Sequence, residues 1–169
     1  MADTRALYQE VILEHNKKPR NYGTLASRSH HAVGHNPLCG DHIEVELDMA
    51  GELGCELAGQ RINGIAFQGS ACAICKSSAS MMTMAVKGKT RSEAEVLIGE
   101  FLGMATGKFD LADAHNIGRL RVFSGIRDLP VRVKCAILPW HTLHAALNAT
   151  QNTTTEAEHD PMHATIGAA

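Results

Sequence analysis

The sequence lacks the features that mark membrane proteins and general nucleic-acid binders. No apolar run approaches the roughly 20 residues that a helix needs to cross a bilayer. The first ten residues are polar and mixed in charge, without the apolar stretch of a secretory signal. Lys and Arg number 16 against 18 Asp and Glu, so the positive surplus that phosphate binding requires is absent. We therefore expect a cytoplasmic protein that binds neither membranes nor nucleic acids.

A disulfide framework is also unexpected, because five cysteines are an odd number in a chain assigned to a reducing compartment. With 169 residues and 18.2 kDa, one domain can bury a core without such cross-links. The two Cys-x-x-Cys knuckles typical of structural zinc sites are missing. So is any Asp/Glu/His cluster with the spacing of a dinuclear hydrolase or nuclease. Clustered cysteines in such a compartment more often bind metal or carry out thiol chemistry.

Hydrophobic periodicity predicts an α+β fold in which helices cover one face of a small antiparallel sheet of about three strands. Residues 42–49 alternate strictly between polar and apolar, as in a half-buried strand. Residues 61–68 alternate again, with Gly64 as a bulge position. Short turns between these strands indicate antiparallel pairing. Further short strands are expected near residues 32–33 and 53–57, and helices over residues 4–15, 72–86, 92–104 and 132–147.

The predicted boundaries rest on local signals. Residues 92–95 resemble a capping box and are expected to open the third helix. Pro139 fits the first turn of a last helix that starts nearer Leu138 than residue 132. Residues 148–169 are rich in Thr, Gln and His and show no periodicity. We expect one domain over residues 1–147 and a disordered tail over residues 148–169.

Three short segments contain the residues best suited to chemistry: residues 36–41, 69–75 and 132–135. Each places a cysteine at the junction of a loop and an element, and such junctions gather at one end of a domain. Cys39 and Asp41 lie two residues apart and face the same way in an extended chain. With Cys72 and Cys135 they offer three sulfurs and one oxygen, which suit tetrahedral Zn²⁺ or iron–sulfur chemistry. The spacing also fits small buried apolar cysteines, so both interpretations stay open here.

Cys72 and Cys75 form a lone Cys-x-x-Cys pair at the start of a predicted helix, a position that lowers the pKa of a nearby thiol. Three interpretations remain open: a redox pair, two metal ligands, or one ligand and one packing cysteine. Cys75 lies one helical turn from Cys72, so its sulfur can reach the same site as a spare ligand or a resolving thiol. Cys55 is remote from every motif and is expected to pack.

These segments, in this order, resemble the signature of the NifU/IscU/SufU family of iron–sulfur cluster assembly proteins. The resemblance spans about residues 5–147 and includes Ser-Ala-Ser-Met-Met at 78–82 and the stretch around Cys135. It is greatest to the SufU branch, because residues 98–130 form a longer stretch than in IscU-type scaffolds. Lys134 also stands where those scaffolds have a histidine. SufU-type sequences usually carry Ser or another small residue in place of Cys75.

The resemblance implies a SufE/NifU-like fold and a Zn²⁺ site made by Cys39, Asp41, Cys72 and Cys135. It implies that Cys39 accepts persulfide sulfur from a cysteine desulfurase, as a sulfurtransferase-like acceptor that can pass sulfur to other cluster assembly proteins. One alternative is a non-enzymatic scaffold that assembles and transfers a [2Fe–2S] cluster, or holds iron, on the same ligands. Another is a structural zinc domain that binds a partner. Lys134 and the longer stretch at residues 98–130 favour the zinc interpretation, whereas Cys75, as an additional ligand, favours a bound cluster.

Overall fold

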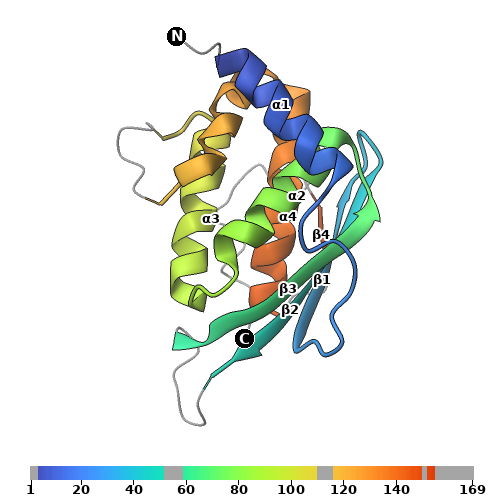
Figure 1. The fold of residues 1–169 in the computed structure, drawn as a ribbon, viewed down its shortest axis with the longest axis vertical. Coiled ribbons are helices and arrows are strands. Elements are labelled where there is room, and N and C mark those ends of the chain that lie inside the picture. Colours follow the sequence, from blue (N-terminus) through green and yellow to red (C-terminus); the bar gives the residue numbers. More distant parts are fainter. Residues whose placement is uncertain (1–3, 52–58, 110–115, 150–151, 155–169) are drawn as a thin grey trace.

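The computed structural model of the chain describes residues 4–51, 59–109, 116–149 and 152–154. Its elements are α1 (Thr4–Lys17), β1 (His30–Asn36), β2 (Asp41–Ala50), β3 (Arg61–Ser70), α2 (Ala73–Val86), α3 (Arg91–Ala105), the 3₁₀ helix η3 (Gly118–Asp128), α4 (Pro130–Leu147) and β4 (Asn152–Thr154) (Figure 1). This order confirms the predicted helix, meander and helices. Among the described residues, no helix is both long and apolar enough to span a membrane.

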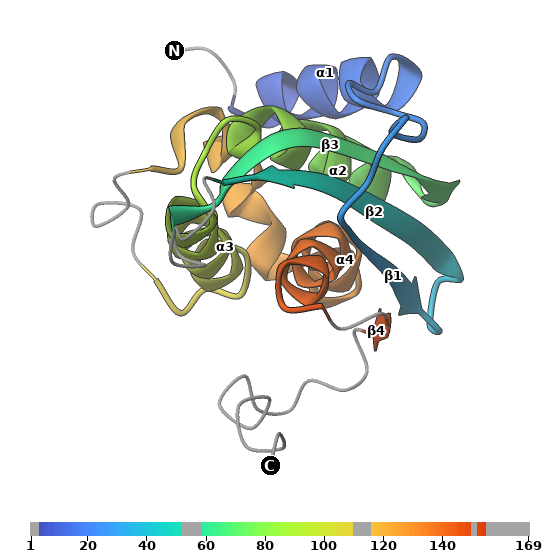
Figure 2. The ribbon, with the colours of Figure 1, turned by 90° about the horizontal axis from the view of Figure 1, so that it is seen from below.

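One face of the sheet carries the core. The sheet has the order β3–β2–β1–β4, and β2 pairs antiparallel with both β1 and β3, as the short turns predict. Ile43, Val45 and Leu47 of β2 are almost completely buried on this face. Helix α4 packs on β1 and β2, while α2 packs against α4 and β3, and α1 lies against α2 (Figure 2). The predicted α+β fold with helices on one face is therefore confirmed.

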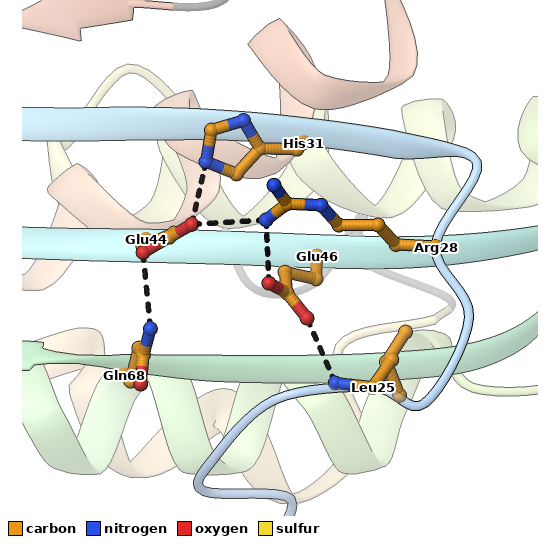
Figure 3. Close-up of polar contacts among 6 residues, drawn as sticks. All are labelled: Leu25, Arg28, His31, Glu44, Glu46 and Gln68. Atoms are coloured by element: carbon orange, nitrogen blue, oxygen red, sulfur yellow. Dashed lines mark hydrogen bonds and ion pairs between the residues drawn. The ribbon is translucent and has the colours of Figure 1, made fainter.

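The opposite face of the sheet is polar, and one of its carboxylates is buried. Glu44 accepts hydrogen bonds from Arg28 and Gln68 and pairs with His31 (Figure 3). Glu46 is only 4% exposed, because the segment before β1 crosses this face and covers it. Its carboxylate accepts from the Arg28 guanidinium at 2.6 Å and from the Leu25 backbone N–H at 2.7 Å. These two bonds satisfy a side chain whose burial would otherwise be costly.

The predicted bulge can be compared with the structure. Asp48 pairs with Gly64, and Met49 pairs with Ile62, which leaves Asn63 as the extra residue of a bulge. The bulge thus lies one residue before the predicted position. A glycine such as Gly64 indicates that the strand bends nearby, but it does not determine which neighbouring residue is left unpaired. The strand predicted over residues 53–57 lies outside the described residues.

Strand β4 lies within residues 148–169, for which the sequence predicts a disordered tail. It pairs in parallel with β1, alongside Val33, Gly34 and His35. The three antiparallel strands are as expected, and β4 adds a short parallel strand to β1. Three residues are too few to show a periodicity, so the sequence pattern contained no signal for this strand. Apart from residues 148–149 and 152–154, the predicted tail lies outside the described residues.

The start of α3 differs from the predicted capping box. Thr90 caps the helix: its hydroxyl accepts from the Glu93 N–H at 3.2 Å, and its own N–H donates to Glu93 Oε2 at 2.8 Å. The box therefore joins Thr90 and Glu93 rather than Ser92 and Glu95. Both pairs have the required spacing. The bridge between Arg61 and Thr90 holds the chain extended at the earlier position.

Helix α4 starts earlier than predicted, with Pro130 in its first turn, so that Pro139 lies inside the helix. Proline is tolerated there because neighbouring packing holds the surrounding turns. Trp140 is fully buried and stacks on Phe101 with ring centroids 4.3 Å apart. Its indole N–H donates to Ser78 Oγ at 3.1 Å, and Ser78 donates to the Ala136 carbonyl at 2.6 Å. These contacts fix α4 against α2. The two helices position two of the predicted ligands, Cys135 and Cys72.

Candidate metal centre

The first two predicted ligands lie at the turn between β1 and β2, Cys39 within the turn and Asp41 at the first residue of β2. Gly40, between them, has φ of +73°, a conformation that glycine adopts without strain. The Gly40 N–H donates to the Asn36 carbonyl at 2.8 Å and closes the turn. Cys39 is exposed, whereas Asp41 begins β2 and is only 2% exposed. The turn thus presents one thiol to solvent and directs one carboxylate inward.

Cys72 reaches the same place as the N-cap of α2. Gly69 has φ of +142°, and a Cβ there would lie 2.1 Å from the His42 carbonyl oxygen, so the chain leaves β3 at a point open only to glycine. Beyond it, the Cys72 N–H donates to Asp41 Oδ1 at 2.7 Å. Cys72 Sγ accepts from the Cys75 N–H at 3.4 Å. The carboxylate and the helix start therefore hold each other in place.

Cys135 completes the group from α4. Its side chain is almost completely buried, and its Sγ lies 3.6 Å from Cys39 Sγ. Asp41 Oδ2 lies 3.0 Å from Cys39 Sγ and 3.4 Å from Cys72 Sγ. One ligand atom from each of Cys39, Asp41 and Cys135 lies within 4.8 Å of the other two. The structure thus brings together all four predicted ligands, which come from three separate segments.

The spacing of these donors fits a tetrahedral cation. Zinc with a Zn–S distance of about 2.3 Å and a Zn–O distance of about 2.0 Å would place two sulfurs about 3.8 Å apart, and a sulfur and an oxygen about 3.5 Å apart. The sulfurs of Cys39 and Cys135 are 3.6 Å apart. Asp41 Oδ2 is 3.4 Å from Cys72 Sγ and 3.0 Å from Cys39 Sγ. Small outward shifts would satisfy these three distances, so the spacing of Cys39, Asp41 and Cys135, with Cys72 in contact with Asp41, fits Zn²⁺.

Without a cation, the three thiols differ in acidity. A hydrogen bond from Cys135 lowers the pKa of Cys72 to about 7, and the same bond raises the pKa of Cys135. Burial raises the pKa of Cys39, and its hydrogen bond to Asp41 acts in the same direction. Cys72 is therefore the sulfur that first becomes a thiolate. Binding of a cation would require the other thiols to release their protons as well.

This order of acidity predicts a pH-dependent reaction. In metal-free protein, we expect alkylation of Cys72 by iodoacetamide to reach half its maximal rate near pH 7, because the thiolate is the reactive form. Cys39 should require a more alkaline solution despite its exposure. Rates follow from mass spectrometry of tryptic peptides 62–76 and 29–61. In Cys135→Ala, which lacks the hydrogen-bond donor, the midpoint of Cys72 should move to higher pH; an unchanged midpoint contradicts the assignment.

Cys75 and Tyr8 complete the description of the site. Cys75 is fully buried in the hydrophobic core, and this burial raises its pKa well above the ordinary value. Its position agrees with the packing interpretation, while Cys55 lies outside the described residues. Tyr8 of α1 was not expected near the site, but its hydroxyl lies close enough to be affected by it: burial raises the pKa of Tyr8, and the charge of Arg132 opposes this increase. Helical periodicity places Tyr8 on a face of α1 without indicating what that face meets.

Comparison with known proteins identifies the family. The NifU-like N-terminal domain family matches residues 7–104, more than half of the chain and the part that contains Cys39, Asp41 and Cys72. The chain belongs to this family. The zinc-dependent sulfurtransferase SufU of Bacillus subtilis is 35% identical over 142 residues, which cover 84% of this chain and 90% of that protein. Relatives of this chain thus include proteins named SufU and proteins named IscU.

Two further relatives connect the chain to scaffold proteins and to a solved fold. The iron–sulfur cluster assembly scaffold protein IscU of Streptococcus pyogenes is 33% identical, with 86% of each chain covered. A crystal structure from Fervidobacterium islandicum, described as a candidate cluster assembly scaffold for the SUF system, superposes with a TM-score of 0.72. It is 29% identical and covers 86% of this chain and 99% of its own. The family assignment and the fold therefore agree.

Proposed function

We propose that this member of the family is a zinc-dependent acceptor of persulfide sulfur in iron–sulfur cluster biogenesis. The observation that supports it is the unequal exposure of the four donors. Asp41 and Cys135 are 2% and 1% exposed, whereas Cys39 is exposed on a turn. One ligand can therefore leave and meet a partner while the others stay in place. The name of the Bacillus subtilis relative, a zinc-dependent sulfurtransferase, supports the same assignment.

In this proposal, Asp41, Cys72, Cys135 and the resting Cys39 would hold Zn²⁺. When bound, Zn²⁺ would keep the thiols deprotonated and protected from oxidation. Cys39 then swings out on its turn and its thiolate attacks the outer sulfur of a persulfide on a cysteine desulfurase. The bond between the two desulfurase sulfurs breaks, and the desulfurase cysteine leaves as a thiolate. Cys39 is left with a persulfide, and atoms and charge balance.

A direct measurement of sulfur tests the proposal. The full-length protein is mixed with a cysteine desulfurase and cysteine, and tryptic peptides are examined by mass spectrometry. We expect one added sulfur atom on peptide 29–61, located at Cys39 by fragmentation rather than at Cys55, which the same peptide contains. Sulfur that appears only on peptide 62–76 or 135–169, or on none, would contradict the role of Cys39.

The main alternative is a scaffold that builds a [2Fe–2S] cluster on the same ligands and hands it on. The IscU scaffold from Streptococcus pyogenes, with 86% coverage of both chains, is the observation that favours it. Metal analysis of protein purified without oxygen separates the two: zinc and a colourless solution support the acceptor, whereas iron, sulfide and visible absorption support the scaffold. A purely structural zinc domain would have a closed site, which the exposed Cys39 disfavours.

A further inference from the structure

Cys75 is a thiol that the proposed function does not use. It is fully buried, yet it lies in the first turn of α2 next to a proposed ligand. Cys72 is the N-cap, and Cys75 is the residue whose backbone N–H donates to Cys72 Sγ at 3.4 Å. As the N-cap, Cys72 has its side chain over the first turn of α2, the same turn that carries the side chain of Cys75. The two sulfurs of the Cys-x-x-Cys segment therefore share one end of one helix.

The backbone permits a bond between them. Residues three apart in a helix have Cα atoms about 5 Å apart, within the range of about 4.4–6.8 Å seen in disulfides. Cys72 has an extended backbone, with φ of −65° and ψ of 166°, so it lies outside the rigid helical turns. Its side chain is half-buried, whereas that of Cys75 is enclosed. An attacking reagent therefore meets Cys72 first, and Cys75 is the sheltered thiol behind it.

Cys72 has two neighbouring thiols: Cys75, whose backbone N–H donates to its sulfur, and Cys135, which donates a hydrogen bond to it. Cys39 and Cys135 have their sulfurs 3.6 Å apart and can pair with each other under oxidation. With three cysteines, such pairing would leave Cys72 as a single half-buried thiol that can form mixed disulfides with other molecules. We propose that Cys72 and Cys75 form a reversible disulfide within α2 when no metal holds the site. This disulfide protects Cys72 in the metal-free site from further oxidation. It also removes Cys72 from the metal ligands until the disulfide is reduced.

The chemistry requires a small disulfide as oxidant. Cys72 attacks one sulfur of this disulfide, forms a mixed disulfide and releases one small thiol. Cys75 then attacks the Cys72 sulfur, breaks the mixed disulfide and releases the second small thiol. The two protein thiols lose two electrons and two protons in all, and the small disulfide gains them. A dithiol reductant reverses both steps.

The test uses full-length protein, stripped of metal with a chelator, and oxidised glutathione. We expect peptide 62–76, which contains both cysteines, to lose two hydrogens and resist alkylation. A bond between Cys39 and Cys135 would instead join peptides 29–61 and 135–169, so the map separates the two. Cys75→Ser should lose the internal disulfide completely and carry glutathione on Cys72. Cys39→Ser should still form the disulfide between Cys72 and Cys75.

Three outcomes would overturn the proposal: peptide 62–76 that stays reduced, wild-type protein that keeps glutathione on Cys72, or Cys72 joined to Cys39 or Cys135. Cys75→Ala provides a second variant if serine disturbs the buried position, and circular dichroism shows whether each variant is folded. The oxidised protein should also fail to bind zinc until it is reduced. No desulfurase is present, so these results are independent of whether Cys39 accepts sulfur.

Discussion

Replacing Cys39 by alanine is expected to reduce the stimulation of a cysteine desulfurase to the rate of the desulfurase alone, while zinc remains bound. The exposed turn lets water take the empty fourth position, and the other three donors are held by β2, α2 and α4. Desulfurase turnover and the zinc content of the purified protein are measured on the same sample. Full stimulation by Cys39→Ala would remove Cys39 from the reaction.

Asp41→Ala provides the matched control for this result. It removes a buried carboxylate that also accepts the Cys72 N–H, so both a ligand and the support of another ligand are lost. We expect zinc affinity to fall by at least about 10–100-fold, the loss typical of removing even an indirect support of a metal ligand. The fold should persist, because β2 remains paired on both sides. If Cys39→Ala and Asp41→Ala lose zinc equally, the difference in exposure between Cys39 and Asp41 does not correspond to a difference in their roles at the metal.

Replacing Trp140 by alanine is expected to lower the free energy of unfolding by about 3–5 kcal/mol. The side chain is fully buried, stacks on Phe101 and donates to Ser78, so its removal leaves a cavity between α2, α3 and α4. Urea denaturation of metal-free protein, followed by circular dichroism, measures the change without the contribution of metal binding.

Trp140→Phe is the control for the cavity. It keeps an aromatic ring near Phe101 but removes the indole N–H, and Ser78 still donates to the Ala136 carbonyl. The loss should therefore be smaller, below about 2 kcal/mol. A loss below about 1 kcal/mol for Trp140→Ala would mean that α4 is not held by this contact.

The sequence predicts best those features that repeat locally. Strict alternation identified β2, because each side chain there faces either the core or the polar face. The same alternation placed Glu46 among exposed polar residues, yet it is buried, because a segment more than 15 residues earlier in the chain covers it. Strand β4 is too short to repeat, and the Thr90 cap was chosen by its contact with β3 rather than by spacing.

The site could be predicted only in part. Cys39 and Asp41 lie two residues apart, so their proximity is visible in the sequence. Their meeting with Cys72 and Cys135 depends on Gly69 and on the packing of α4 against α2, which no local pattern contains. The resemblance to the family provided this information instead. The exposure of each side chain was also beyond the sequence, and it is exposure that separates Cys39 from the buried Asp41 and Cys135.

The donors belong to a turn, a strand and two helices, and residues 96 positions apart lie in contact there. A bound cation would act as a cross-link between distant parts of the chain. Because an ion that binds only the folded protein stabilises it by mass action, a free concentration 100 times Kd would add about 2.7 kcal/mol. The melting temperature of this protein would then report how much zinc its surroundings make available.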